Sequence, residues 1–271
     1  MIRRIIRAIA IALFLLLALC FPFGPLFPWS PWKPGYASLN LDRADIYYPS
    51  GTRLPGAFLD VDGFITQSEQ FHRLKVPKRI SVILCRTWND FGRFMPTLGR
   101  VGAATLDTGT VIYVTPRIAE RGLDYGEFLR HEISHATLHQ NQAIWNAHAA
   151  SKAPWFYEGL AVSFGRQKAY ASIQEFTAFT IARDLVAVID PAKARPDLRT
   201  DIRYSYQVWR YFLEHLIDTE GRDKFQQLIQ GMMRDPTASE RVFKEVYGTP
   251  LPDAARGFRN DVVSRKWTAR P

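Results

Sequence analysis

A pair of histidines four residues apart constrains this chain more than any other feature of its sequence. His131 and His135 flank Glu132-Ile133-Ser134, and the apolar residues around them recur with a helical period. Because residues i and i+4 share one face of an α-helix, both imidazoles can reach the same metal ion. Asp124, with Glu127 three residues later, predicts where this helix begins. The chain must therefore fold so that one helix presents two metal-binding side chains to a common point.

Glu132 directly follows the first histidine and is the candidate general base. It is offset by one residue from the histidine face, so it can approach a metal-bound water from the side. Zinc lowers the pKa of such a water towards about 7, and a carboxylate can take its proton as it attacks a carbonyl. The alternative is a surface glutamate between two histidines that are satisfied by hydrogen bonds.

A third metal ligand is predicted at Glu158, 23 residues after His135. Glu158 lies in the apolar stretch 154–161, PWFYEGLA, where a lone carboxylate is costly to bury unless something pairs with it. A metal ion would supply that partner, and two imidazoles with one carboxylate and an open position suit Zn²⁺. The alternative is a glutamate at a helix start, facing solvent near the helix dipole.

The other histidines are weaker candidates. His139 continues the same helical stripe but stands one turn too far to join the other two on one ion. His148, in a loop, could approach the site, although a solvated loop histidine is the simpler interpretation. His72 and His215 have no supporting context.

The overall pattern predicts an α+β fold, in which a small strand-rich N-terminal half packs on a helical half that carries the His131 helix. Residues 79–84 form a β-branched run, residues 105–114 suggest two extended pieces about a glycine turn, and residues 88–94 suggest a short helix. Gly159 is expected to interrupt a helix around residues 155–164. Further helices are expected at 170–188, 204–218, 222–233, 239–247 and 253–266.

The N-terminus has the features of a membrane anchor. Arg3, Arg4 and Arg7 precede an apolar run over residues 8–21, which neighbouring apolar residues extend to about twenty. The arginines should stay cytoplasmic, which places the following domain on the extracytoplasmic side. No small-x-small cleavage site follows the run directly, so an uncleaved anchor is favoured over a cleaved signal segment. We expect a single-pass protein of the cell inner membrane with a periplasmic domain.

Prolines recur every third residue from Pro22 to Pro34, a spacing that suits a stiff polyproline II spacer with interleaved aromatic residues. The expected division is therefore residues 1–28 as anchor or signal segment, 22–40 as proline-rich spacer and 41–271 as the catalytic domain. The formal net charge is +9, of which four charges fall in the first forty residues. Basic residues form no dense run, so nucleic acid is not an expected partner.

At the two metal motifs, HEISH and WFYEGLAVSF, the sequence resembles the gluzincin zinc metallopeptidases, in particular the compact, mostly bacterial "peptidase MA-like" domains. The resemblance covers roughly residues 79–265. It implies a zincin-like fold, with His131, His135 and Glu158 as zinc ligands and Glu132 as general base. It also implies a tyrosine that donates to the developing oxyanion. Tyr206 fits the spacing of that residue, and Tyr204 is the nearby alternative. For both tyrosines an equal alternative is that they pack in the protein core as aromatic residues of an amphipathic helix.

One departure narrows the expected activity. The related aminopeptidases carry a G-x-M-E-N strand about thirty residues before HExxH, but residues 102–106 here read GAATL and contain no acid. We therefore expect a membrane-anchored zinc endopeptidase that acts on peptide or protein substrates. Two alternatives stay open: a catalytically idle zincin-like binding module at the membrane, and a zinc hydrolase that acts on cell-wall peptide. No feature of the sequence indicates an oligomeric state.

Overall fold

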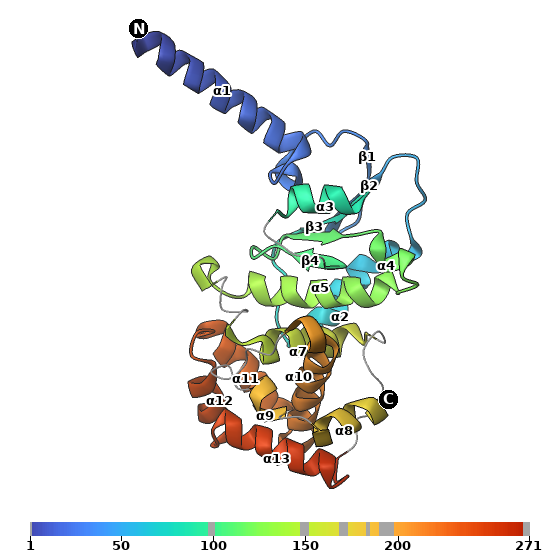
Figure 1. Ribbon diagram of the computed structural model, residues 1–271, viewed down its shortest axis with the longest axis vertical. Coiled ribbons are helices and arrows are strands. Elements are labelled where there is room, and N and C mark those ends of the chain that lie inside the picture. Colours follow the sequence, from blue (N-terminus) through green and yellow to red (C-terminus); the bar gives the residue numbers. More distant parts are fainter. Residues whose placement is uncertain are drawn as a thin grey trace.

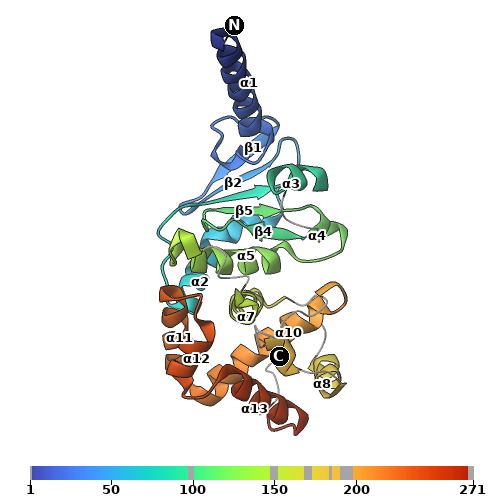
Figure 2. The same cartoon turned by 60° about the vertical axis from the view of Figure 1, so that its left-hand side comes forward.

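The computed structural model describes residues 2–96, 101–146, 152–167, 173–182, 185–189 and 198–267. Its N-terminal half contains a five-stranded mixed sheet in the order β1-β2-β3-β5-β4, and its C-terminal half is helical (Figures 1 and 2). The strands are β1 Tyr36–Asn40, β2 Ala44–Pro49, β3 Ile80–Leu84, β4 Ala103–Thr105 and β5 Val111–Val114. The fold is α+β, as the sequence predicts.

Parallel pairing of β3 with both β2 and β5 forms the centre of the sheet, and antiparallel β1 and β4 close its two edges. Of the two extended pieces expected in 105–114, the second is β5, whereas the first, β4, begins earlier at Ala103 and ends at Thr105; Gly109 takes a positive φ of 67° in the turn between them. The expected strand at 79–84 is β3, and the short helix at 88–94 is α3 (Trp88–Phe94). These local predictions are confirmed.

The two faces of the sheet support separate apolar clusters. On one face, Ile46, Val82 and Ile112 pack with Leu129 and Ile133 of helix α5 (Tyr125–Gln140). On the other face, residues of β3 and β5 pack with α3 and with Phe27. Because successive residues of a strand point to opposite faces of the sheet, the same strands contribute apolar side chains to both clusters.

Helix α5 lies between the sheet and the helical half (Figure 1). Asp124 caps its N-terminus as predicted, because Asp124 Oδ1 accepts a hydrogen bond of 2.6 Å from the Gly126 backbone N–H. The helical half packs beneath α5 around an aromatic core that includes Trp155, Phe212 and Phe243. Its helices are α7 Pro154–Gly165, α8 Ile173–Ala182, α9 Leu185–Ile189, α10 Leu198–Glu220, α11 Arg222–Arg234, α12 Ser239–Tyr247 and α13 Leu251–Val263.

Gly159 does not interrupt a helix, contrary to the prediction, because α7 runs through it from Pro154 to Gly165. A Cβ atom at position 159 would lie 2.8 Å from the Trp209 carbonyl oxygen and 2.8 Å from Leu213 Cδ1. The glycine therefore allows α7 to approach α10 closely, and this packing outweighs its local cost to the helix.

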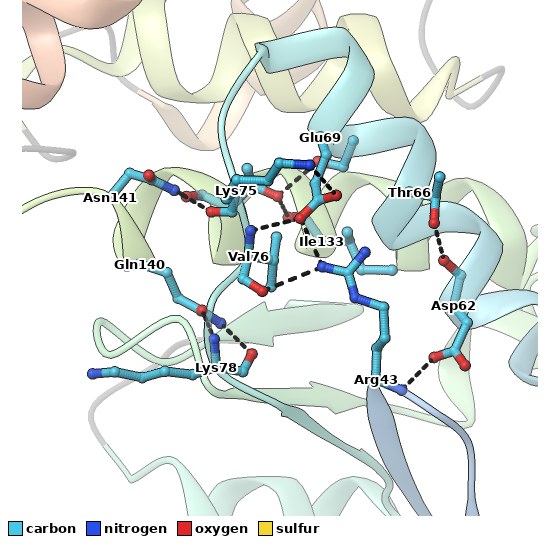
Figure 3. A network of polar contacts seen from close by, with 12 residues as sticks. Arg43, Asp62, Thr66, Glu69, Lys75, Val76, Lys78, Ile133, Gln140 and Asn141 are labelled. Carbon is cyan, nitrogen blue, oxygen red and sulfur yellow. Dashed lines mark hydrogen bonds and ion pairs between the residues drawn. The ribbon is translucent and has the colours of Figure 1, made fainter.

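A polar network ties helix α2 (Val61–His72) to the sheet and to the end of α5 (Figure 3). Glu69 Oε1 accepts hydrogen bonds from Arg43 at 2.7 Å and from the Val76 backbone N–H at 2.9 Å. Near the end of α5, Gln140 accepts from the Lys78 backbone N–H at 2.8 Å. Together these contacts fix the chain that leads into β3 against the helix that carries His131 and His135.

The N-terminal segment forms helix α1 (Ile2–Phe23), and its stretch from Arg3 to Phe23 is long and apolar enough to cross a membrane. The expected polyproline II spacer is wrong for the residues that follow. Pro22 lies inside α1, and Pro28 lies in the 3₁₀-helix η1 (Phe27–Trp29), where Phe27 and Pro28 are buried against the protein. Residues 36–40, also assigned to the spacer, form β1.

Candidate metal centre

His131 and His135 project from the side of α5 that faces away from the sheet. The two Nε2 atoms lie 3.1 Å apart, and their rings meet edge to face with centroids 4.8 Å apart. Both side chains are largely buried, at 8% and 11% exposed. Leu129, Ile133 and Ala136 point to the sheet instead. The helical phase that buries these apolar residues therefore turns the two histidines towards α7.

Helix α7 brings Glu158 to the same point. Glu158 Oε2 lies 3.4 Å from His131 Nε2 and 3.5 Å from His135 Nε2. Gly165, at the other end of α7, helps the two helices approach, because a Cβ there would lie 3.1 Å from the Glu127 carbonyl oxygen and 3.3 Å from His131 Cβ. The structure thus brings together the three residues that the sequence nominates as ligands.

The geometry of these three atoms matches a tetrahedral zinc site. Bonds of about 2.0–2.2 Å arranged tetrahedrally separate the ligand atoms by about 3.3 Å. The three separations measured here are 3.1, 3.4 and 3.5 Å. Among the described residues, no hydrogen bond reaches the buried Glu158 Oε2. A buried carboxylate oxygen without a donor, faced by two ring nitrogens, fits a cation between them.

The charges of the cluster reinforce one another. Burial by itself raises the pKa of Glu158, but the adjacent His135 and His131 outweigh it and hold that pKa well below its usual value. Burial lowers the pKa of His135, but the Glu158 carboxylate raises it by a larger amount, so the net shift of the His135 pKa is upward. Glu158 is therefore a carboxylate at neutral pH, the form that binds a metal ion.

Glu132 lies on α5 beside the cluster and is bonded to the sheet. Thr105 Oγ1, at the end of β4, lies 2.7 Å from Glu132 Oε2 and 2.9 Å from the Glu132 backbone carbonyl oxygen. The Glu132 residue is 5% exposed. The sequence gives no hint of this contact, because Thr105 stands 27 residues earlier in a strand predicted only in outline.

Of the two tyrosines considered, Tyr206 has a ring contact with the cluster formed by His131, His135 and Glu158. Its ring centroid lies 6.3 Å from that of His131. Tyr204, two residues earlier on α10, points to α8, where its ring packs on Phe176 and Phe179 and its hydroxyl lies 3.5 Å from Thr180 Oγ1. Tyr206 is thus the tyrosine positioned beside the cluster.

The remaining described histidines have other partners. His139 Nδ1 accepts from Gln142 at 2.8 Å, and burial lowers the His139 pKa to about 4, so this residue is neutral. His72 Nε2 lies 2.9 Å from Ser134 Oγ behind the metal-binding face, and burial lowers its pKa to about 3. His215 pairs with Asp261 at 3.1 Å. His148 lies outside the described residues.

The His72–Ser134 contact is a second link that the sequence analysis missed. His72 ends α2 and Ser134 lies inside the HExxH segment, so the contact joins two helices that are distant in the chain. A serine between the two histidines is the one signal that could have suggested a polar partner behind α5.

No protein-family model and no curated protein matches this chain. Among solved structures, it is similar to an M1 zinc metallopeptidase mutant from Deinococcus radiodurans, with 15% identity and a TM-score of 0.47 over 87% of this chain and 52% of that one. A two-domain M1 zinc metallopeptidase mutant bound to L-arginine gives 15% identity and a TM-score of 0.46 over the same shares. This chain therefore spans about half the length of those proteins.

Proposed function

We propose that this chain is a membrane-anchored, zinc-dependent peptidase of the gluzincin type, and that it acts as an endopeptidase. The observation that carries the proposal is the triangle formed by His131 Nε2, His135 Nε2 and Glu158 Oε2, with edges of 3.1, 3.4 and 3.5 Å. Two neutral imidazoles and one carboxylate are the ligand set of catalytic zinc sites that keep a further position open.

His131, His135 and Glu158 would hold the ion. Zinc bound there would act as a Lewis acid on a substrate carbonyl and would lower the pKa of a water molecule in the site. The protein holds these ligands on two packed helices, whose approach depends on Gly165. A site built on rigid helices keeps its ligands in place through turnover.

Glu132 would act as the general base. Its carboxylate would accept a proton from the attacking water and then transfer that proton to the nitrogen of the leaving amine. Thr105, 2.7 Å from Oε2, fixes the orientation of the carboxylate. Tyr206, whose ring lies beside His131, would donate its hydroxyl proton in a hydrogen bond to the oxyanion that develops on the carbonyl.

A peptide is the substrate class that the edge of the sheet favours. Backbone bonds Thr115 N–H to Gly102 O and Leu106 N–H to Val111 O place residues 102, 104 and 106 in hydrogen-bonded pairs with β5. Hydrogen-bonded and non-bonded pairs alternate in an antiparallel ladder, so the backbone groups of Ala103 and Thr105 point away from β5, at the edge of the described sheet. An extended peptide could pair with them next to Glu132.

The membrane anchor is α1, whose 22 residues span about 33 Å at 1.5 Å each, close to the thickness of a bilayer core. Its basic residues Arg3, Arg4 and Arg7 lie at the N-terminal end. By the positive-inside rule, the metal centre would lie outside the cytoplasm, on the periplasmic side of the inner membrane.

The proposal is tested by digesting a peptide library with the full chain in detergent and zinc, beside Glu132→Gln as the matched variant. We expect internal cleavage by the parent chain, and loss of at least about a hundredfold in kcat with Glu132→Gln, because a general base contributes that much. Unchanged turnover in Glu132→Gln would exclude Glu132 as the base. Zinc bound without cleavage of any peptide would favour an idle binding module.

A further inference from the structure

The segment between α1 and β1 is built into the folded domain. Phe27 is 1% exposed and stacks on Phe94 of α3 with ring centroids 4.4 Å apart. The Phe27 ring also contacts the ring of Tyr36, with centroids 5.0 Å apart. These contacts place Phe27 in the same apolar cluster as Ile83 and Tyr113 of the central strands. The residue thus belongs to the core on the α3 face of the sheet.

Lys33 makes a second set of contacts between this segment and the domain. Its Nζ atom donates to the carbonyl oxygens of Ser30 at 2.6 Å and Pro28 at 3.2 Å. The same atom lies 4.2 Å from the centre of the Tyr47 ring on β2, within the range of a cation–π contact. A single ammonium group therefore closes the turn around η1 and holds it against the sheet.

A third set of contacts holds the segment where it enters the sheet. Arg86 donates to the Gly35 carbonyl oxygen at 3.0 Å, and the Arg86 backbone N–H donates to Tyr36 Oη at 3.3 Å. Gly35 takes a positive φ of 76°, which turns the chain into β1. Residues 24–36, hereafter the collar, are thus attached to the domain through Phe27, Lys33 and the Gly35–Tyr36 end.

The outer side of the collar is apolar and aromatic. Trp29 and Trp32 are 52% and 63% exposed, and Phe23, at the end of α1, is 51% exposed and contacts Trp32 at 6.3 Å. This aromatic surface continues directly from a helix long enough to span a bilayer. Tryptophan favours the interface between lipid tails and water, so the surface suits the headgroup region of a bilayer.

We propose that the collar places Trp29 and Trp32 in the membrane interface and connects α1 rigidly to the sheet. The domain is then held at a fixed height and orientation above the bilayer. The collar and the metal centre lie on opposite faces of the sheet, since Phe27 packs on the α3 face and α5 on the other. If the proposed peptidase function holds, substrates reach the site from the aqueous side, beyond the sheet, and not from within the bilayer.

A distance measurement between spin labels tests the rigid connection. Cys20 in α1 can be labelled selectively, because Cys85 is buried, and a second label goes on a Lys244→Cys variant of the full chain. In nanodiscs of phosphatidylethanolamine and phosphatidylglycerol, we expect a narrow distance distribution. A short Gly-Ser insertion between Gly24 and Pro25 leaves Phe27 in place and should widen the distribution at least about twofold, as expected of a flexible linker.

A parent distribution as broad as that of the insertion variant would overturn the proposal. Phe27→Ala should widen the distribution as well; if that variant fails to fold, the insertion variant still decides, because it keeps the core intact. Neither measurement involves turnover, so an absence of peptidase activity would leave the result standing.

Quenching by brominated lipids tests the membrane contact. Dibrominated phosphatidylcholine in the nanodisc should quench part of the tryptophan fluorescence of the full chain. The fraction of fluorescence that the brominated lipid quenches should fall towards zero in the double variant Trp29→Phe/Trp32→Phe. It should persist in Trp267→Phe, a matched substitution beyond the end of α13. Equal quenching of the parent chain and the double variant would contradict a seat for these residues in the bilayer.

Discussion

The hydroxyl of Thr105 lies 2.7 Å from Oε2 of Glu132 and 2.9 Å from the backbone carbonyl oxygen of the same residue. One side chain of an edge strand thus contacts both the carboxylate and the backbone of the proposed general base. Because a hydroxyl carries one proton, it donates to one of these oxygens at a time. The contact couples the edge of the sheet, where a peptide could bind, to the group that would transfer the proton.

Thr105→Val should lower kcat about tenfold with little change in KM, because losing a hydrogen bond to a charged group costs about 1.5 kcal/mol. Thr105→Ser should restore most of the activity. Zinc content should stay the same in both variants, since the hydrogen bonds of the Thr105 hydroxyl go to Glu132 and not to a proposed ligand. Thr108→Val, which removes only a contact with Thr110 in the nearby turn, is the control. Equal kcat in Thr105→Val and the parent chain would exclude this role.

Tyr206→Phe should lower kcat by about a hundredfold, the effect of removing one donor to an oxyanion, and should leave zinc binding intact. Tyr204→Phe is the matched control, because Tyr204 lies on the same helix but packs against α8. Steady-state kinetics on one peptide compares the two variants. A larger loss in Tyr204→Phe than in Tyr206→Phe would reverse the assignment.

Gly159→Ala should destabilise the domain by about 1–3 kcal/mol, because the added methyl group overlaps Trp209 and Leu213 at the contact between α7 and α10. Gly257→Ala offers a matched control inside α13, where, apart from its chain neighbours and the backbone of its own helix, no described atom lies within 4 Å of an added Cβ. There alanine should stabilise the protein by about 0.5–1 kcal/mol, through helix propensity alone. Urea unfolding of both variants measures the change in unfolding free energy, which should be negative for Gly159→Ala and positive for Gly257→Ala. Changes of the same sign would argue against the close contact between α7 and α10.

Acid stability should depend on Glu69. The hydrogen bond from Arg43 lowers the pKa of Glu69 from 4.5 to about 2. Because the folded-state pKa is the lower one, the stabilisation is fully present above pH 4.5 and is lost as the pH falls towards 2. The difference in unfolding free energy between the parent chain and Glu69→Gln should therefore shrink across this window. A difference that stays constant between pH 4.5 and 2 for Glu69→Gln would contradict the lowered pKa of Glu69.

The sequence predicts the parts of the site that depend on local spacing. His131 and His135 share a helix face by their separation, and the apolar surroundings of Glu158 indicate a carboxylate that needs a partner. The Asp124 cap and the strand at residues 80–84 are local signals of the same kind. Each of these depends on residues within a few positions of one another.

Contacts between distant segments are what the sequence does not reveal. Gly159 suggests a helix break by propensity, but the close approach of α10 is a tertiary contact and decides the outcome. Thr105 and His72 reach α5 from other elements, so no spacing rule identifies them. The proline period after α1 suggests an extended spacer, whereas burial of Phe27 turns that segment onto the sheet.

Zinc analysis of the purified full chain tests the central claim most directly. We expect one zinc per chain, retained in Glu132→Gln and lost in both His135→Ala and Glu158→Ala, because only the latter two remove ligand atoms from the triangle. Circular dichroism of each variant would confirm that the helices remain folded. A folded parent chain without stoichiometric zinc, or zinc content unchanged in Glu158→Ala, would contradict the account.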